Sequence, residues 1–88
     1  MIVYSVVGIF TSEGTTYVEV FPQVYTDIKK ASNKLKEVIE TEKPDSWMEE
    51  DISEDWKYNS ENILIEYSAT NEYEDSINIF IRKLDVCD

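Results

Sequence analysis

The chain has 88 residues, of which 19 are Asp or Glu, 8 are Lys or Arg and none is His, so its formal net charge is −11. This length suits a single domain over residues 1–88. The absence of His excludes Ser-His-Asp catalysis, Cys-His catalysis and His-based metal sites. The lone cysteine, Cys87, cannot close an intramolecular disulfide or contribute to a cysteine cluster.

The first two elements are predicted to be strands. Residues 2–11 are rich in β-branched and aromatic side chains and are apolar on both alternating faces, which is typical of a central or covered strand. Ser12, Glu13 and Gly14 indicate a tight turn. Residues 15–21 read as a second strand, which Pro22 is expected to end because proline cannot donate to a ladder. We therefore expect an antiparallel hairpin.

Residues 26–42 are predicted to form the main helix. Thr26 can cap its N-terminus, and Asp27 suits the positive end of the helix dipole. Pro44 ends the run. One apolar stripe recurs at helical spacing and should face the core, and it consists of Ile28, Ala31, Leu35, Val38 and Ile39.

Residues 45–61 permit two interpretations. Ser46 followed by Glu49 matches a capping box, and Met48, Ile52 and Trp56 recur at i, i+4 and i+8, on one side of a short second helix. The alternative is a loop held against the core by its two tryptophans.

Residues 62–70 and 76–84 alternate between apolar and polar side chains and are predicted to form a second hairpin. Its inward residues should be Ile63, Ile65, Tyr67, Ala69, Ile77, Ile79 and Ile81. The order β-β-α-β-β predicts an α+β fold, a four-stranded antiparallel sheet with the main helix on one face. The other face then needs a cover. Either the segment 47–56 supplies it, or a second copy does, giving a homodimer through Tyr4, Val6, Phe10 and Phe80.

The negative charge is concentrated in residues 44–75, which contain eleven acids and one base, a net charge of −10. A patch of this charge would steer a protein partner with a basic groove and raise its association rate. The residues expected to bind such a partner are Glu49, Glu50, Asp51, Glu54 and Asp55, with a second patch at Glu72, Glu74 and Asp75. The alternative is a solvated surface that serves solubility alone.

No catalytic residue, cofactor or metal is expected. Clustered carboxylates suit Ca²⁺ or Mg²⁺, but the EF-hand loop pattern and a Gly-rich phosphate loop are both absent. Paired carboxylates such as Glu49 and Glu50 would need a cleft that shifts their pKa values, which a chain of this size rarely builds. No apolar run approaches the ~20 residues of a membrane span, and the first residues lack a signal-peptide pattern. We therefore expect no membrane partner and a cytoplasmic location.

Direct binding of nucleic acid is disfavoured, because duplex DNA carries about one negative charge per 1.7 Å of its axis. The small size, the acidity, the hairpin–helix–hairpin order and the acidic segment WMEEDISEDW at 47–56 resemble small phage- or mobile-element-encoded inhibitors. DNA-mimicking anti-restriction and anti-CRISPR proteins are of this kind, and acidic immunity proteins that neutralise nuclease toxins are similar in size and charge. The resemblance implies a non-catalytic protein that inhibits a basic nucleic-acid-handling partner, with DNA mimicry as one mode. The alternative is a small structural or oligomeric module whose acidity serves solubility.

Overall fold

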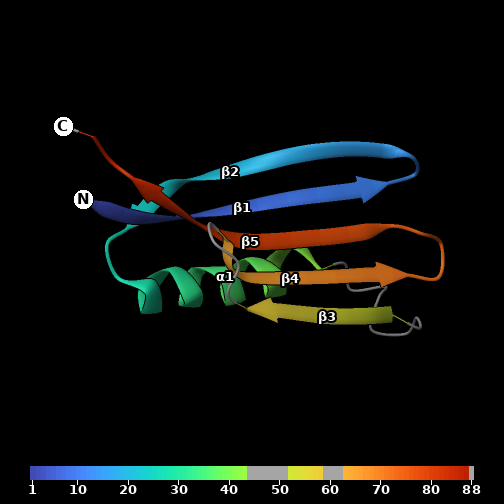
Figure 1. The fold of residues 1–88 in the computed structure, drawn as a ribbon. Coiled ribbons are helices and arrows are strands. Elements are labelled where there is room, and N and C mark those ends of the chain that lie inside the picture. Colours follow the sequence, from blue (N-terminus) through green and yellow to red (C-terminus); the bar gives the residue numbers. More distant parts are fainter. Residues whose placement is uncertain (44–51, 59–62, 88) are drawn as a thin grey trace.

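The computed structural model describes residues 1–43, 52–58 and 63–87. Its elements are β1 (Ile2–Ser12), β2 (Thr15–Tyr25), α1 (Ile28–Glu42), β3 (Ile52–Tyr58), β4 (Ile63–Asn71) and β5 (Ser76–Asp85). The strands form one antiparallel sheet in the order β2-β1-β5-β4-β3. The helix α1 lies along one face of this sheet (Figure 1). The α+β class with one helix and an antiparallel sheet is thus confirmed, whereas the prediction of four strands is wrong, since the described residues form five.

The additional strand is β3, at residues where the sequence suggested a helix or a loop. β3 pairs with β4 from Ile52, opposite Asn71, to Tyr58, opposite Ile65. The ring of Trp56 lies 4.9 Å from that of Tyr67 on β4, a cross-strand contact that stabilises sheets. A spacing of four residues returns to the same side in a strand as well as in a helix. The recurrence of Ile52 and Trp56 is therefore explained by a strand, and Met48 lies outside the described residues.

The second strand does not end before Pro22, because β2 continues to Tyr25. Its ladder with β1 is irregular at this point, passing from Val20 opposite Val7 to Val24 opposite Ser5. β2 also lies at the edge of the sheet. Proline is tolerated on an edge strand and at a bulge, since no ladder hydrogen bond is lost there.

The helix begins later than predicted, and its cap is Asp27 rather than Thr26. Asp27 has extended backbone angles, and its side chain accepts a hydrogen bond of 2.8 Å from the backbone N–H of Lys29. Burial confirms the predicted stripe: Ala31 and Leu35 are fully buried, as is Val38, while the two flanking isoleucines are half-buried.

The core lies between α1 and the sheet, and it contains most of the residues predicted for a dimer interface. Val6 and Phe10 are buried in the cluster that packs around α1, and Tyr4 packs against the same cluster. Phe80 lies opposite Val7 on β1, and therefore projects from the other face of the sheet. The interface predicted through Tyr4, Val6, Phe10 and Phe80 is wrong, because the helix covers three of these side chains and the fourth points away from it.

No helix in the described part of the chain is long and apolar enough to cross a membrane.

Candidate functional site

Two hairpin turns lie side by side at one end of the sheet (Figure 1). β1 and β5 are antiparallel neighbours, with Thr11 opposite Ser76, so the β1–β2 turn and the β4–β5 turn meet there. The C-terminal end of α1 reaches the same end, where Glu42 and Asp75 line one pocket. We call this region the acidic end, and its carboxylates belong to Glu13, Glu42, Glu72, Glu74 and Asp75.

The β1–β2 turn consists of Glu13 and Gly14, and both have positive φ angles, 53° and 79°. This is the pattern of a type I′ turn, whose twist matches that of the flanking strands. A glutamate is uncommon at positive φ. Its backbone N–H donates a hydrogen bond of 3.1 Å to Oδ1 of Asp75, so the second hairpin supports the first.

The β4–β5 turn is organised by the buried side chain of Asn71. Its Oδ1 accepts hydrogen bonds from the backbone N–H groups of Tyr73, at 3.0 Å, and Asp75, at 2.9 Å. Its Nδ2 donates to Oδ2 of Asp75 at 3.3 Å. Glu72 and Glu74 are exposed on this turn, with the latter at φ 66°. The turn therefore has a fixed backbone that presents two carboxylates to solvent, while the carboxylate of Asp75 holds the two turns together.

The first patch predicted from the sequence is divided by the strand geometry. Glu54 and Asp55 are successive residues of β3 and project from opposite faces of the sheet. Oε2 of Glu54 accepts a hydrogen bond of 2.7 Å from the Tyr67 hydroxyl, and its Oε1 lies 3.6 Å from Nζ of Lys43. Glu54 therefore makes contacts within the protein while its side chain remains partly exposed, and Asp55 is exposed on the other face. The other predicted members, Glu49, Glu50 and Asp51, lie outside the described residues.

The contact between Tyr67 and Glu54 also changes the acidity of the tyrosine. Burial raises the pKa of the Tyr67 hydroxyl above its ordinary value near 10. The hydrogen bond to Glu54 and the negative charge of that carboxylate act in the same direction. The hydroxyl therefore stays protonated and serves as a hydrogen-bond donor at neutral pH.

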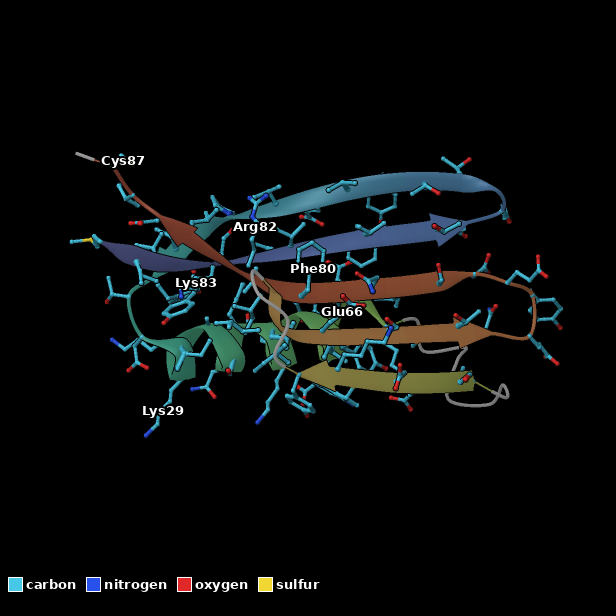
Figure 2. The ribbon with its side chains drawn as sticks, viewed as in Figure 1. Lys29, Glu66, Phe80, Arg82, Lys83 and Cys87 are labelled. Carbon is cyan, nitrogen blue, oxygen red and sulfur yellow. The ribbon has the colours of Figure 1, made fainter. Side chains whose placement is uncertain are left out.

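The charges of the described residues are separated along the molecule. Three ion pairs occur in the described ranges, and none involves a carboxylate of the acidic end. Figure 2 shows Lys29, Arg82 and Lys83 in the half of the molecule away from the hairpin turns. Lys30 adjoins Lys29 in the first turn of α1. The protein therefore has an electrostatic polarity: the carboxylates of the acidic end form no ion pair, and toward the other end four cationic side chains outnumber the acids Asp27 and Asp85.

An open pocket of about 110 Å³ lies at the acidic end. Glu42 and Asp75 line it together with the rings of Phe10 and Tyr17, which stack with their centroids 5.1 Å apart. Carboxylates beside an aromatic ring suit a cationic group, which gains from charge-assisted hydrogen bonds and from the negative face of the ring. The pocket can therefore receive the end of a lysine or arginine side chain.

Sequence reasoning did not include Glu13 and Glu42 among the site residues. Both lie in residues 1–43, where six acids and five lysines nearly cancel, so a segment-by-segment sum of charge conceals them. The missing information was the pairing of β1 with β5, which brings the two turns to one end.

Among the described residues, no three acidic or cysteine side chains lie close enough together to hold a metal ion. No protein-family model, curated protein or solved structure matches this chain.

Proposed function

We propose that this protein is a non-catalytic binding protein that uses its acidic end to engage and inhibit a partner with a basic, nucleic-acid-binding surface. The observation that carries the proposal is the group of carboxylates at the acidic end. Hydrogen bonds fix the backbones of the two turns and the carboxylate of Asp75, and no ion pair of the described residues neutralises the group. A basic partner would be attracted to this end and turned toward it by the cationic residues at the other.

The pocket beside Glu42 and Asp75 gives the contact an anchor. A lysine or arginine of the partner that enters the pocket would lie beside two carboxylates and the ring of Tyr17. Anchors of this kind dominate the affinity of protein interfaces, while exposed charges around them chiefly set the association rate. The exposed Glu72 and Glu74 take the second role in this proposal.

The size of the charge favours a local contact over mimicry of a long duplex. The molecule extends 46 Å along its longest axis. A DNA duplex of that length would carry about 27 phosphate charges, at one per 1.7 Å. The net charge of the protein is −11, less than half of that number. We therefore propose that any mimicry replaces the few phosphates that a basic groove contacts, not a whole stretch of DNA.

The test measures how strongly two variants with the same change in net charge bind to an immobilised arginine-rich peptide. The first variant reverses the exposed acids of the acidic end, Glu13→Lys, Glu72→Lys and Glu74→Lys. The control variant reverses exposed acids elsewhere, Glu37→Lys, Glu40→Lys and Asp85→Lys. The first should weaken binding by about tenfold or more relative to the control, and raising the salt concentration should reduce the difference. Equal binding by the two variants would mean that the acidic end is only a solvated surface.

Inhibition is tested on a partner captured by the wild-type protein and not by the first variant. Duplex DNA should then compete with the protein for that partner. If a captured partner binds DNA and this protein at the same time, the contact does not occupy the nucleic-acid site and the inhibitory part of the proposal is wrong.

A further inference from the structure

The strand β2 forms a long edge of the sheet with little to prevent another strand from pairing with it. Within the described ranges β2 has only β1 as a neighbour, so its outer row of backbone N–H and C=O groups faces solvent. Natural edges are protected by charged side chains, prolines, bulges or short length. Pro22 and the irregularity beside it protect the second half of β2. Residues 15–21 have neither, and Glu19 is their one charged side chain.

The exposed side chains of β2 continue an apolar surface on the face of the sheet opposite α1. Val18 is 61% exposed and Val20 is 56% exposed. They lie opposite Ile9 and Val7 of β1, and Val7 in turn lies opposite Phe80 of β5, which Figure 2 labels on this face. An apolar surface therefore reaches the edge of the sheet at β2 and stops there.

We infer that β2 pairs with β2 of a second copy of this chain, so that two sheets join into one across a two-fold axis. A second β2 matches this edge, because it presents the same exposed Val18 and Val20, and the charge distribution determines where two copies can approach. A basic partner is attracted to the acidic end, whereas two copies with a charge of −11 each repel one another wherever acids are dense. Of the two edge strands, β2 carries little charge, whereas β3 at the opposite edge carries Glu54, Asp55 and Lys57 within seven residues.

The register of the pairing follows from symmetry. A two-fold axis perpendicular to the sheet keeps the two faces of the sheet separate, so each residue must pair with one on its own face. The axis must therefore pass beside a residue that lies opposite its own copy. Tyr17, Val18, Glu19 and Val20 are the residues near the middle of the unprotected segment.

Three of these four registers are unfavourable. An axis at Glu19 places two carboxylates directly opposite each other. An axis at Val20 brings Pro22 into the ladder, where it cannot donate a hydrogen bond. An axis at Tyr17 limits the ladder to residues 15–19, because the turn begins beyond them. An axis at Val18 pairs all of residues 15–21, places Tyr17 opposite Glu19, and joins the two apolar surfaces through Val18 of both copies.

Cysteine cross-linking tests this register in chains that carry Cys87→Ser, which removes the exposed native thiol. Opposed residues of antiparallel strands have Cα atoms about 4.5 or 5.5 Å apart, and both distances lie within the range of a disulfide. Val18→Cys should therefore give a covalent dimer under mild oxidation. Val24→Cys is the matched control, equally exposed but about 40 Å from its copy in this register. Equal cross-linking at both positions, or none at Val18, would refute the pairing.

Sedimentation provides a test without cysteines. The wild-type protein should sediment as a dimer of twice 10.3 kDa, and the dimer should strengthen at high salt because screening reduces the repulsion. Val18→Lys should give a monomer that keeps its circular dichroism spectrum, since two lysines then meet at the axis of an exposed edge. Ser53→Lys, on the exposed β3 edge, adds the same charge and should remain dimeric. A wild-type monomer at high concentration and high salt, or a Val18→Lys dimer, would overturn the inference.

These outcomes are distinguishable from those for the acidic end, although Tyr17 lines the pocket and also lies in the proposed ladder. Partner binding should weaken as salt rises, while dimerisation should strengthen. The variants also change different elements, the hairpin turns in one case and the middle of β2 in the other.

Discussion

Replacing Tyr67 by phenylalanine removes a hydroxyl group and leaves a buried ring in place. Tyr67 is 1% exposed, and its ring contacts Trp56 with 4.9 Å between centroids. The lost atom is the donor of the 2.7 Å hydrogen bond to Oε2 of Glu54. Because the ring and its packing remain, the measured change reports on this hydrogen bond rather than on a cavity.

The expected loss in the free energy of unfolding at neutral pH is about 1.5 kcal/mol. A hydrogen bond to a charged group contributes about 1.5–3 kcal/mol. The side chain of Glu54 is 43% exposed and its Oε1 lies 3.6 Å from Nζ of Lys43, so water and the lysine still stabilise the carboxylate in the variant. The loss should therefore lie at the lower end of the range.

The same substitution changes how stability depends on pH. The pKa of Tyr67 is raised in the folded protein, so above about pH 10 the unfolded chain loses this proton while the folded protein retains it. The stabilisation that comes from this raised pKa is fully present below the pKa of Tyr67 in the unfolded chain. It declines as pH rises, by about 1.4 kcal/mol per pH unit, until the Tyr67 hydroxyl of the folded protein also loses its proton. Tyr67→Phe should lack this part of the decline. Denaturant titrations of both proteins from neutral to strongly alkaline pH measure it, and parallel curves for the two would refute the proposed environment of the hydroxyl.

Three further substitutions test the packing and the turns by denaturant titration. Leu35→Ala leaves a cavity at a fully buried position on α1 and should lower the free energy of unfolding by ~2–5 kcal/mol. Lys30→Ala, on the exposed side of the helix, should lower it by less than about 0.5 kcal/mol. Equal values would mean that the buried face of the helix is misassigned. Gly8→Ala places a Cβ 2.7 Å from ring carbons of the buried Phe10. It should lower the free energy of unfolding by about 1–3 kcal/mol and change the near-ultraviolet circular dichroism signal. An unchanged stability would show that the ring moves freely. Asn71→Ala removes the acceptor of two backbone hydrogen bonds in the β4–β5 turn and should cost about 1–3 kcal/mol, and an unchanged midpoint would show that the turn does not need this side chain.

The sequence was informative wherever one periodicity excluded the other. The stripe through Ala31 and Leu35 fits a helix and no strand, and the alternation of Ile77, Ile79 and Ile81 fits a strand and no helix. Both predictions are confirmed. β3 was missed because Ile52 and Trp56 are four residues apart, a spacing that both structures allow. Only the tertiary pairing with β4 selects between them.

The site was less predictable than the fold, because it depends on which strands are neighbours. The exposed position of Glu72 and Glu74 follows from their place in a polar turn between two strands. The presence of Glu13 beside them depends on the pairing of β1 with β5, which joins segments more than 60 residues apart. Glu54 shows another limit of the sequence: its acidic neighbours gave no sign of the contacts that its exposed side chain makes with Tyr67 and Lys43 from its position on β3.

The central position of β1 and β5 also determines how the chain reaches its native state. The hairpins β1–β2 and β4–β5 each close locally, on the microsecond timescale of hairpin formation. The β1–β5 ladder joins Ile2 to Asp85, so it closes a loop of nearly the whole chain and forms contacts of very high sequence separation. We expect this closure to limit the folding rate to the slow range of small β-rich domains. Until it occurs, a chain emerging from the ribosome exposes both apolar faces of β1, so the period of greatest aggregation risk ends only when β5 is in place.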